Sequence, residues 1–391
     1  MRMEQVYTLL NTVTQEVTGQ SGLVKEDLSN VVEVGETIEN FEHGVDNFVR
    51  SLIDHIGKVV FVDRLYRGRM PSVLMDGWEY GSILEKIRMD LPTAQENKTW
   101  ELQNNVSYDP HVFKKPNVSA KFFNDRVTFE VQMSITRRQV KSAFSTATQL
   151  NGFMSMIQTQ IANSITVKTD ALIARVINAA IGETLYSSFP SGTYTGVSGV
   201  RAVNLLKLYQ DTLPEGESEI TAEEAIYDPA FIRFSTFMMK NYISRLQSMS
   251  VLFNNGGTHK FTSLDRLHFV MLEQFRSAAE VYLYDGLNQF NTESLRLPEY
   301  TESVPYWQGS GTAFDFADTS KINITTPSGH DIVADGIVAV MFDRDTLGVA
   351  NLDKYVESIY NPSASFWNEW HKTDMGLFYD SDENFVVFYI A

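Results

Sequence analysis

The feature that most constrains this chain is a helical pattern of unusual length. Apolar residues recur at helical spacing from Leu150 to Ala180, and Gly182 then provides a stop signal. A helix of about 30 residues is about 45 Å long, whereas the average helix of a compact domain has about 11–12 residues. The alternative interpretation is a pair of helices separated near Asn163 and Ser164.

Shorter patterns on both sides of this segment mix helix and strand. Amphipathic spacing predicts helices at residues 1–17, 41–56, 137–146, 198–212, 229–248 and 277–285. Alternating or continuous apolar runs predict strands at residues 59–62, 82–88, 99–103, 118–135, 259–262, 267–272, 336–342, 353–360, 366–378 and 385–390. The last three make a β-rich tail that ends in a buried strand. The chain is therefore expected to have an α+β fold.

Residues 64–117 form a segment of a different kind. Glycine and proline interrupt it repeatedly, and it lacks a dense hydrophobic pattern over a length that is too great for an ordinary connection. Its aromatic residues argue against disorder: Tyr66, Trp78, Tyr80, Trp100 and Tyr108. Because an isolated two-stranded hairpin is marginally stable in water, we expect this excursion to pack on an external surface.

The net charge of −17 is distributed unevenly. Residues 64–141 hold 13 basic and 9 acidic side chains, for +4, so the rest of the chain carries −21. Complementary patches on identical chains can direct self-association, and we therefore predict that this basic segment lies on an acidic neighbour. The alternative is an ordinary fluctuation of surface charge. The acidic total argues against tight binding of nucleic acid.

The sequence contains no recognisable catalytic, phosphate-binding or metal-binding motif. The sequence contains no cysteine, which excludes disulfides, thiolate metal sites and a cysteine nucleophile. It has no phosphate-binding loop, His-Glu-x-x-His zinc motif or Gly-x-Ser-x-Gly elbow. Asp343 and Asp345 could form a carboxylate pair for metal or acid–base chemistry, but two acids at this spacing after a strand are more often turn residues. We expect no enzymatic activity, no cofactor and no metal site. With no signal peptide and no membrane-length apolar run, we also expect a protein that starts in a cytoplasm and contacts no membrane.

Three local sequences, together with the order of the expected elements, resemble the major capsid proteins of tailed bacteriophages, especially those of small podophages. Residues 51–60 (SLIDHIGKVV) look like the entry into the extended loop of those proteins, and residues 77–87 (GWEYGSILEKI) look like a strand of that loop. Residues 365–370 (SFWNEW) with 384–388 (NFVVF) resemble their C-terminal ending.

This resemblance implies a tailed-phage capsid fold with an N-terminal arm, an extended β loop, a peripheral domain with a long spine helix, and an axial domain. The implied boundaries are 1–38 for the arm, 39–61 for the start of the peripheral domain, 62–135 for the extended loop, 136–198 for the peripheral domain with its spine helix, 199–344 for the axial domain, and 345–391 for the β-rich C-terminal part of the peripheral domain.

The implied function is structural. Hexamers and pentamers of the chain would form an icosahedral shell around double-stranded DNA, with the DNA held inside without tight specific binding. Further implied partners are a scaffolding protein, a portal, and decoration or fibre proteins, in a virion assembled in the host bacterial cytoplasm. The alternatives are a portal or tail-tube ring protein and, less favoured, a soluble hydrolase. The candidate contacts between subunits are Arg64, Arg67, Arg69, Trp78, Tyr80, Lys86, Arg88, Trp100, Lys114 and Lys115, with the basic residues facing acids such as those at 353–383.

Overall fold

The structure is a computed structural model of the chain. It describes residues 3–20, 22–25, 29–40, 47–48, 51, 70–75, 84–94, 96–108, 111, 113–139, 147–214, 219–283, 298, 300–307 and 320–391. The chain divides into two compact units. The first comprises Met1–Gly77, Arg126–Ile173 and Val349–Gly376, and the second comprises Trp78–Asp125, Ala174–Gly348 and Leu377–Ala391. Helices and strands contribute to both units, which confirms the expected α+β class.

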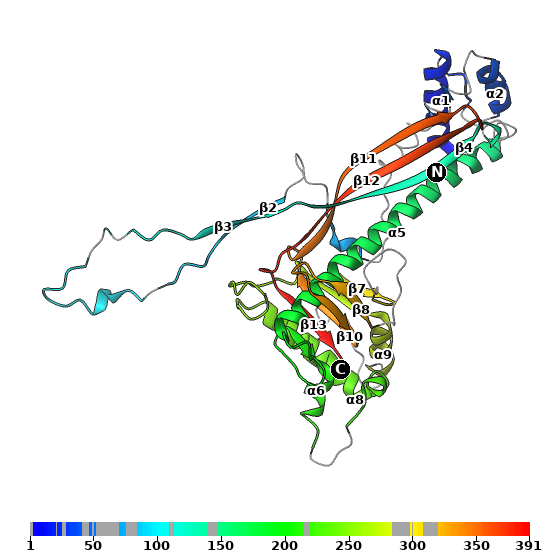
Figure 1. The fold of residues 1–391 in the computed structure, drawn as a ribbon. Helices are drawn as coiled ribbons and strands as arrows, with labels where there is room; N and C mark the ends of the chain where they lie inside the picture. The colour runs from blue at the N-terminus through cyan, green and yellow to red at the C-terminus, as the bar shows by residue number, and fades with distance from the viewer. Residues whose placement is uncertain are drawn as a thin grey trace. The chain divides into compact units, whose positions relative to one another are not determined.

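Helix α5 (Ala147–Ser188) confirms the long-helix prediction, and the boundary between the units falls within it. Its 42 residues form one helix, drawn in green in Figure 1, and correspond to a length of about 63 Å. The alternative of a break near Asn163 and Ser164 is wrong, because both residues lie inside the continuous helix. Ile173, Ile177 and Ile181 are fully buried on one stripe of α5.

In the first unit, two helices and a sheet can be described. The elements are α1 (Met3–Thr18), α2 (Val31–Asn40), β1 (Leu74–Met75), β4 (Asp125–Thr136), β11 (Leu347–Asn361) and β12 (Phe366–Tyr379). The strands pair in the order β1-β11-β12-β4. Val13 of α1 and Ile38 of α2 are buried, so the N-terminal helix prediction is confirmed. Along β12, burial alternates between neighbouring residues, as a strand with one covered face requires.

The second unit is built on a five-stranded sheet in the order β5-β13-β10-β6-β7. Its strands are β5 (Ala202–Asn204), β6 (Leu267–Leu272), β7 (Tyr300–Val304), β10 (Ile337–Asp343) and β13 (Phe385–Tyr389). Every residue of β10 and β13 is buried, because these apolar runs lie inside the sheet. Around the sheet are α6 (Leu205–Gln210), α7 (Ala222–Ala225), α8 (Pro229–Leu246), α9 (Glu273–Leu283) and the paired strands β8 (Ile322–Thr325) and β9 (Asp331–Ala334).

A row of stacked rings crosses this sheet. Tyr300, His268, Phe342 and Phe385 lie in direct register on the neighbouring strands β7, β6, β10 and β13. Their successive ring centroids are 4.7, 5.2 and 5.7 Å apart, with small angles between the ring planes. Such cross-strand aromatic contacts stabilise the register of a sheet. His268 is thus a titratable ring in an otherwise apolar layer, with 1% of its surface exposed.

Two predicted elements differ from the structure for local reasons. The strand expected at 99–103 is wrong: residues 98–100 form the 3₁₀ turn η2, because the side-chain oxygen of Asn97 accepts a hydrogen bond from the Thr99 N–H at 3.0 Å. The helix expected at 198–212 begins only at residue 205. The three preceding residues pair with β13, and Asn204 caps the short helix by accepting from the Lys207 N–H.

Two strand predictions also need correction. The strand expected at 118–135 is two strands, β3 (Val118–Phe123) and β4, because β3 pairs with β2 (Leu84–Met89) while β4 joins the sheet of the first unit. The strand expected at 259–262 is a single bridge between Ser250 and Lys260. The helix at 41–56 and the strand at 59–62 lie outside the described residues, apart from residues 47–48 and 51.

Candidate functional site

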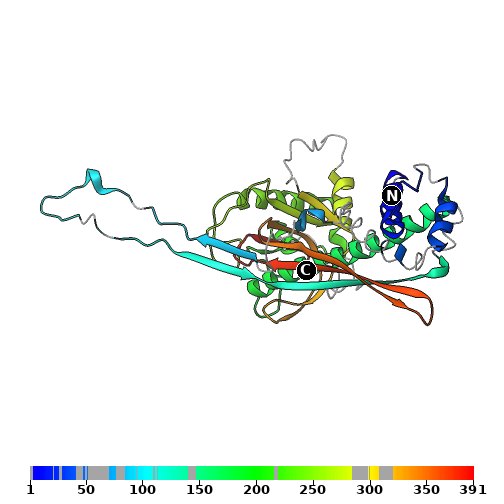
Figure 2. The same ribbon diagram turned by 90° about the horizontal axis from the view of Figure 1, so that it is seen from above.

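The second unit contains an extended hairpin, defined here as residues 84–123. Strands β2 and β3 pair antiparallel at its base, with Lys86 opposite Lys121 and Ile87 opposite Ala120. Beyond these strands the two chain segments continue as a long excursion, drawn in cyan to teal in Figures 1 and 2. The base therefore has two faces of different chemistry, one charged and one apolar.

An acidic turn, residues 380–383, receives the charged face. It joins β12 to β13 within the second unit, and the side chains of Asp380, Asp382 and Glu383 are only 5%, 6% and 12% exposed. The turn is held by its own backbone, since the Asp380 N–H donates to the Thr346 carbonyl at 2.6 Å and the Asp382 N–H donates to Asp380 Oδ1 at 3.1 Å. The turn is thus held in part by hydrogen bonds that do not involve the hairpin.

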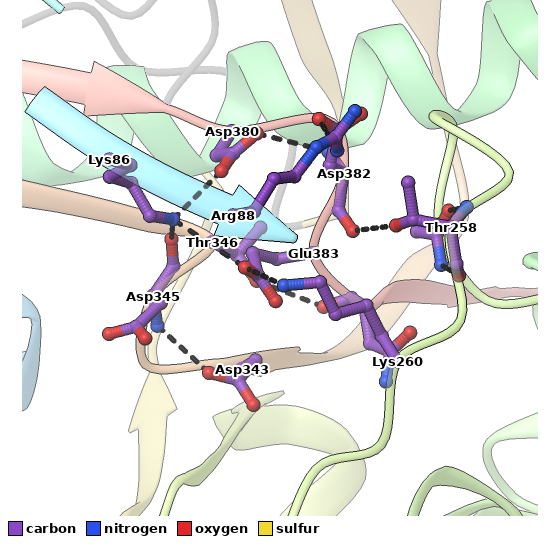
Figure 3. A network of polar contacts seen from close by, with 12 residues as sticks. Lys86, Arg88, Thr258, Lys260, Asp343, Asp345, Thr346, Asp380, Asp382 and Glu383 are labelled. Atoms are coloured by element: carbon purple, nitrogen blue, oxygen red, sulfur yellow. Dashed lines mark hydrogen bonds and ion pairs between the residues drawn. The ribbon is translucent and has the colours of Figure 1, made fainter. Parts of the chain in front are cut away.

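We call the contacts between the hairpin base and this turn the clamp. Lys86 Nζ donates to Asp380 Oδ2 at 2.8 Å, and Lys121 Nζ lies 3.0 Å from Asp380 Oδ1. Arg88 pairs with Asp382 through a short contact, and Lys121 also reaches Asp382. Figure 3 shows Lys86 and Arg88 reaching from the β2 arrow toward the turn. The clamp ties a loop-like excursion to the end of a core strand.

The opposite charges of the clamp offset an unfavourable effect on both partners: repulsion between two lysines of the hairpin, and burial of a carboxylate in the acidic turn. Lys86 and Lys121 are direct cross-strand neighbours, and like charges in that position repel. Burial alone would raise the pKa of Asp380, but the hydrogen bond and charge of Lys86 outweigh burial, with help from the Asp382 N–H and Lys121, and the pKa is lowered. Asp380 therefore remains ionised, and its negative charge offsets the repulsion between the two lysines on the same face of the hairpin.

Groups from the rest of the unit complete the network. Lys260 Nζ lies 2.6 Å from Glu383 Oε1, and the Thr258 hydroxyl donates to the Asp382 carbonyl at 2.9 Å. A Cβ at Gly256 would lie 1.8 Å from Asp382 Oδ1. The clamp thus depends on a glycine that leaves room for the carboxylate.

Asp343 and Asp345 take part in the contacts of a neighbouring turn. Asp343 Oδ1 accepts from the Asp345 N–H at 3.0 Å, and both carboxylates pair with Arg266. This is the turn role that the sequence spacing favoured. The described residues contain no group of three or more potential metal ligands. Within the same residues, no helix combines the length and apolar character needed to cross a membrane.

The opposite face of the hairpin base carries Glu85 but is otherwise apolar, and its side chains are exposed. Ile87, Met89, Val118 and Phe122 are 69%, 58%, 55% and 64% exposed. Because β-strand side chains alternate, these residues share the face that points away from Lys86. Further along, Trp100 is 97% exposed and Phe113 is 85% exposed. Large apolar side chains gathered on one exposed element indicate a surface for association.

The predicted contact residues fall into three groups: some pair with acids of the same chain, some lie on the excursion, and some lie outside the described residues. Lys86 and Arg88 pair with acids in the expected 353–383 region, but these acids belong to the same chain. Trp100, Lys114 and Lys115 lie on the excursion, where Trp100 is almost fully exposed. The remaining predicted residues lie outside the described part of the chain: Arg64, Arg67, Arg69, Trp78 and Tyr80.

Sequence reasoning missed Lys121 and Lys260 as members of this network. Lys121 carries a usable signal, because β2 and β3 both alternate and one register of the hairpin brings two lysines together beside the same face. Lys260 has no such signal, since it lies 123 residues from its partner Glu383.

A family model shows the family of the chain, and the relatives and solved structures that it resembles are phage capsid proteins. A family model described as Phi29-like phage major capsid protein matches residues 10–389. A curated major capsid protein of Bacillus phage GA-1 is 30% identical over 153 residues, which span 37% of this chain and 30% of that protein. A chain in the capsid structure of Staphylococcus phage Andhra has the same fold, with a TM-score of 0.52 and 11% identity, covering 84% of this chain and 87% of that one.

Proposed function

The chain belongs to the family of Phi29-like phage major capsid proteins, and we propose that copies of it associate as hexamers and pentamers that close into an icosahedral shell around double-stranded DNA. Members of this family are structural proteins rather than enzymes. A scaffolding protein and a portal would be needed to start and direct such a shell in the host cytoplasm, and decoration or fibre proteins could bind its outer surface.

The observation that carries this proposal is the extended hairpin. Its charged face is satisfied inside the chain by the clamp, whereas its apolar face and its tip are exposed. A two-stranded ribbon with an uncovered apolar face gains stability only when another surface covers it. A second copy of the chain supplies that surface in a shell built of one protein.

The free energy available from burying apolar surface supports a contact through Trp100 and Phe113, which lie beyond the paired strands of the hairpin. A buried aromatic side chain removes about 150–250 Å² from water, at about 25 cal/mol per Å². Covering Trp100 and Phe113 would therefore contribute on the order of 7–12 kcal/mol before the entropy of ordering residues 96–113 is subtracted. Exposed ion pairs contribute much less, so the aromatic side chains should dominate this contact.

The proposal also accounts for the acidity of the chain. With a net charge of −17, a shell of many copies repels DNA rather than gripping it, because phosphate binding needs clustered cations. DNA held by confinement can be packaged and released without breaking many protein contacts.

The test is assembly of the double variant Trp100→Ser, Phe113→Ser, examined by electron microscopy with the scaffold partner present. We expect normal circular dichroism but few or no shells. Val281→Ser, which removes a 69% exposed residue of α9, is the matched control and should assemble. Shells at wild-type yield from the double variant would contradict the role of the hairpin. Failure of the wild-type chain to form shells under any condition would contradict the shell itself.

A further inference from the structure

Helix α8 presents only positive charge. It carries Arg233, Lys240 and Arg245 and has no acidic residue between Pro229 and Leu246. All three side chains are exposed. Among the described residues, no carboxylate lies within 4 Å of Lys240 or Arg245, whose charges are therefore available to a partner.

A groove of about 780 Å³ lies beside the C-terminal half of α8. Met238, Tyr242 and Arg245 of the helix line one side, and the rest is lined by residues 198–200, Leu208 of α6, residues 248–250 and residues 252–253. Val200, Met249 and Leu252 are 48%, 50% and 56% exposed there. The Arg245 guanidinium lies 5.0 Å from the centroid of the Tyr242 ring. The groove therefore combines exposed apolar side chains with one cation held in place by an aromatic ring.

The segment that precedes α8 has the opposite charge. Residues 211–228 contain seven acidic residues and no lysine or arginine. Within the described part, Asp228 caps α8 by accepting from the Ala230 and Phe231 N–H groups, and Glu224 closes a capping box with Thr221. Glu223 is exposed, and Tyr227 is 65% exposed. This segment thus holds a carboxylate and an aromatic side chain out to solvent on a rigid turn.

These two surfaces lie at opposite ends of one helix. The groove is lined from Met238 onward, along the C-terminal half of α8, whereas the acidic segment precedes Pro229. Tyr227 does not fill the groove of its own chain, because its side chain is 65% exposed. Two complementary patches on opposite ends of one body favour a head-to-tail contact between copies, and such a contact closes into rings when the rotation per copy permits.

We propose that the groove receives residues 219–228 of a second copy of the chain, with Tyr227 against the apolar lining and Glu223 near Arg245. This inference rests on the proposed self-assembly and names one of its contacts. The aromatic side chain supplies the buried area, and the charge pair selects this orientation over an isologous contact, which would bring Arg245 against Arg245.

The chain has no cysteine, so single cysteines give an unambiguous cross-linking test. The test mixes full-length Leu252→Cys and Ala222→Cys chains, which keep Tyr227 and Glu223 intact and place the second cysteine at an exposed position of the same segment. The chains are assembled with scaffold, and the particles are treated with a short bifunctional maleimide. We expect a cross-linked dimer from the mixture, whereas each single variant alone should give at most a trace. A chain that carries both cysteines, the double-cysteine variant, should give a ladder of higher species. Val333→Cys replaces Leu252→Cys in the control, because it is 54% exposed on β9 of the same unit.

The outcomes separate this inference from the shell proposal. Intact shells without the Leu252–Ala222 product, or with equal product from the Val333 control, overturn the inference and leave the shell standing. Strong cross-linking of Leu252→Cys with itself also overturns it, because that result shows an isologous contact or another occupant of the groove. A chain that forms no particles at all contradicts both.

Charge reversal provides an independent readout. Arg245→Glu should reduce the cross-linking yield of the double-cysteine variant at least fivefold, and adding Glu223→Lys should restore a large part of it. Equal yields before and after reversal would refute the pairing of these two residues.

Discussion

The neutral His268 ring should make the fold sensitive to acid. Burial, together with the positive charge of Arg344, lowers the pKa of His268 from 6.5 to about 4. Tyr300 and Phe342 stack on its two sides and offer no negative charge to a protonated ring. The unfolded chain has no such constraint and takes up the proton at ordinary pH.

The difference in proton uptake between the folded and unfolded states sets how the free energy of unfolding changes with pH. A histidine whose pKa is lowered by folding contributes its full stability above about pH 6.5, and this contribution is lost as the pH falls toward 4. At pH 5, the unfolded state binds nearly one more proton at this site than the folded state. The free energy of unfolding should therefore be about 2 kcal/mol lower at pH 5 than at pH 7.5 from this residue alone.

The assay compares urea unfolding of the unassembled wild-type chain and His268→Phe at pH 7.5 and pH 5. Phenylalanine keeps the stacked ring and removes the titration, and all other ionisable groups cancel in the comparison. The wild type should lose about 2 kcal/mol more than the variant, while His259→Phe, at an exposed histidine, should behave as the wild type does. Parallel losses in wild type and His268→Phe would refute the reasoning.

Three further predictions concern the clamp and the turns around the sheet. Asp382→Asn removes a carboxylate shared by two cations of the clamp and should cost about 1–2 kcal/mol, seen as faster hydrogen exchange in β2. Gly256→Ala should have the same signature, because the added Cβ lies 1.8 Å from Asp382 Oδ1; unchanged exchange would count against the clamp. Gly336→Ala should cost more than about 2 kcal/mol in urea unfolding, since its φ is +73° and its Cβ would lie 1.9 Å from the Ile390 carbonyl oxygen. Gly329→Ala, at a φ of +85° with open space, should cost only about 1 kcal/mol, and equal losses would contradict the steric argument.

The elements that could be predicted are those with strong periodicity or continuous apolar runs. The helix from Leu150 to Ala180 and the strands of the tail follow from patterns that leave little choice of burial. The predictions at 99–103 and 198–212 failed because single asparagine side chains, Asn97 and Asn204, set the local backbone.

The clamp could be predicted only in part. Charge patterns predicted that Lys86 and Arg88 face acids between 353 and 383 of a neighbouring subunit, and the structure pairs them with Asp380 and Asp382 of their own chain. The sequence contains no information on whether a basic and an acidic segment meet within one chain or between two. That choice depends on how β12 and β13 enter the sheet, which is set by contacts between residues far apart in the sequence. Gly256 carries no signal in the sequence for the same reason, because its importance depends on one close approach to Asp382.

The acidic turn has a mechanical consequence. It leads directly into β13, which lies between β5 and β10 inside the five-stranded sheet. A tensile force on the hairpin is therefore shared between the backbone, which continues from β3 into β4, and the clamp, which leads to the N-terminal end of β13. If the pull runs along that strand, it loads the hydrogen bonds to both neighbours in shear, so that they must break together rather than unzip one by one. The ion pairs are weaker than these shear-loaded hydrogen bonds taken together, so an overloaded hairpin would separate from the acidic turn first, while the backbone into β4 keeps it attached and the sheet stays intact.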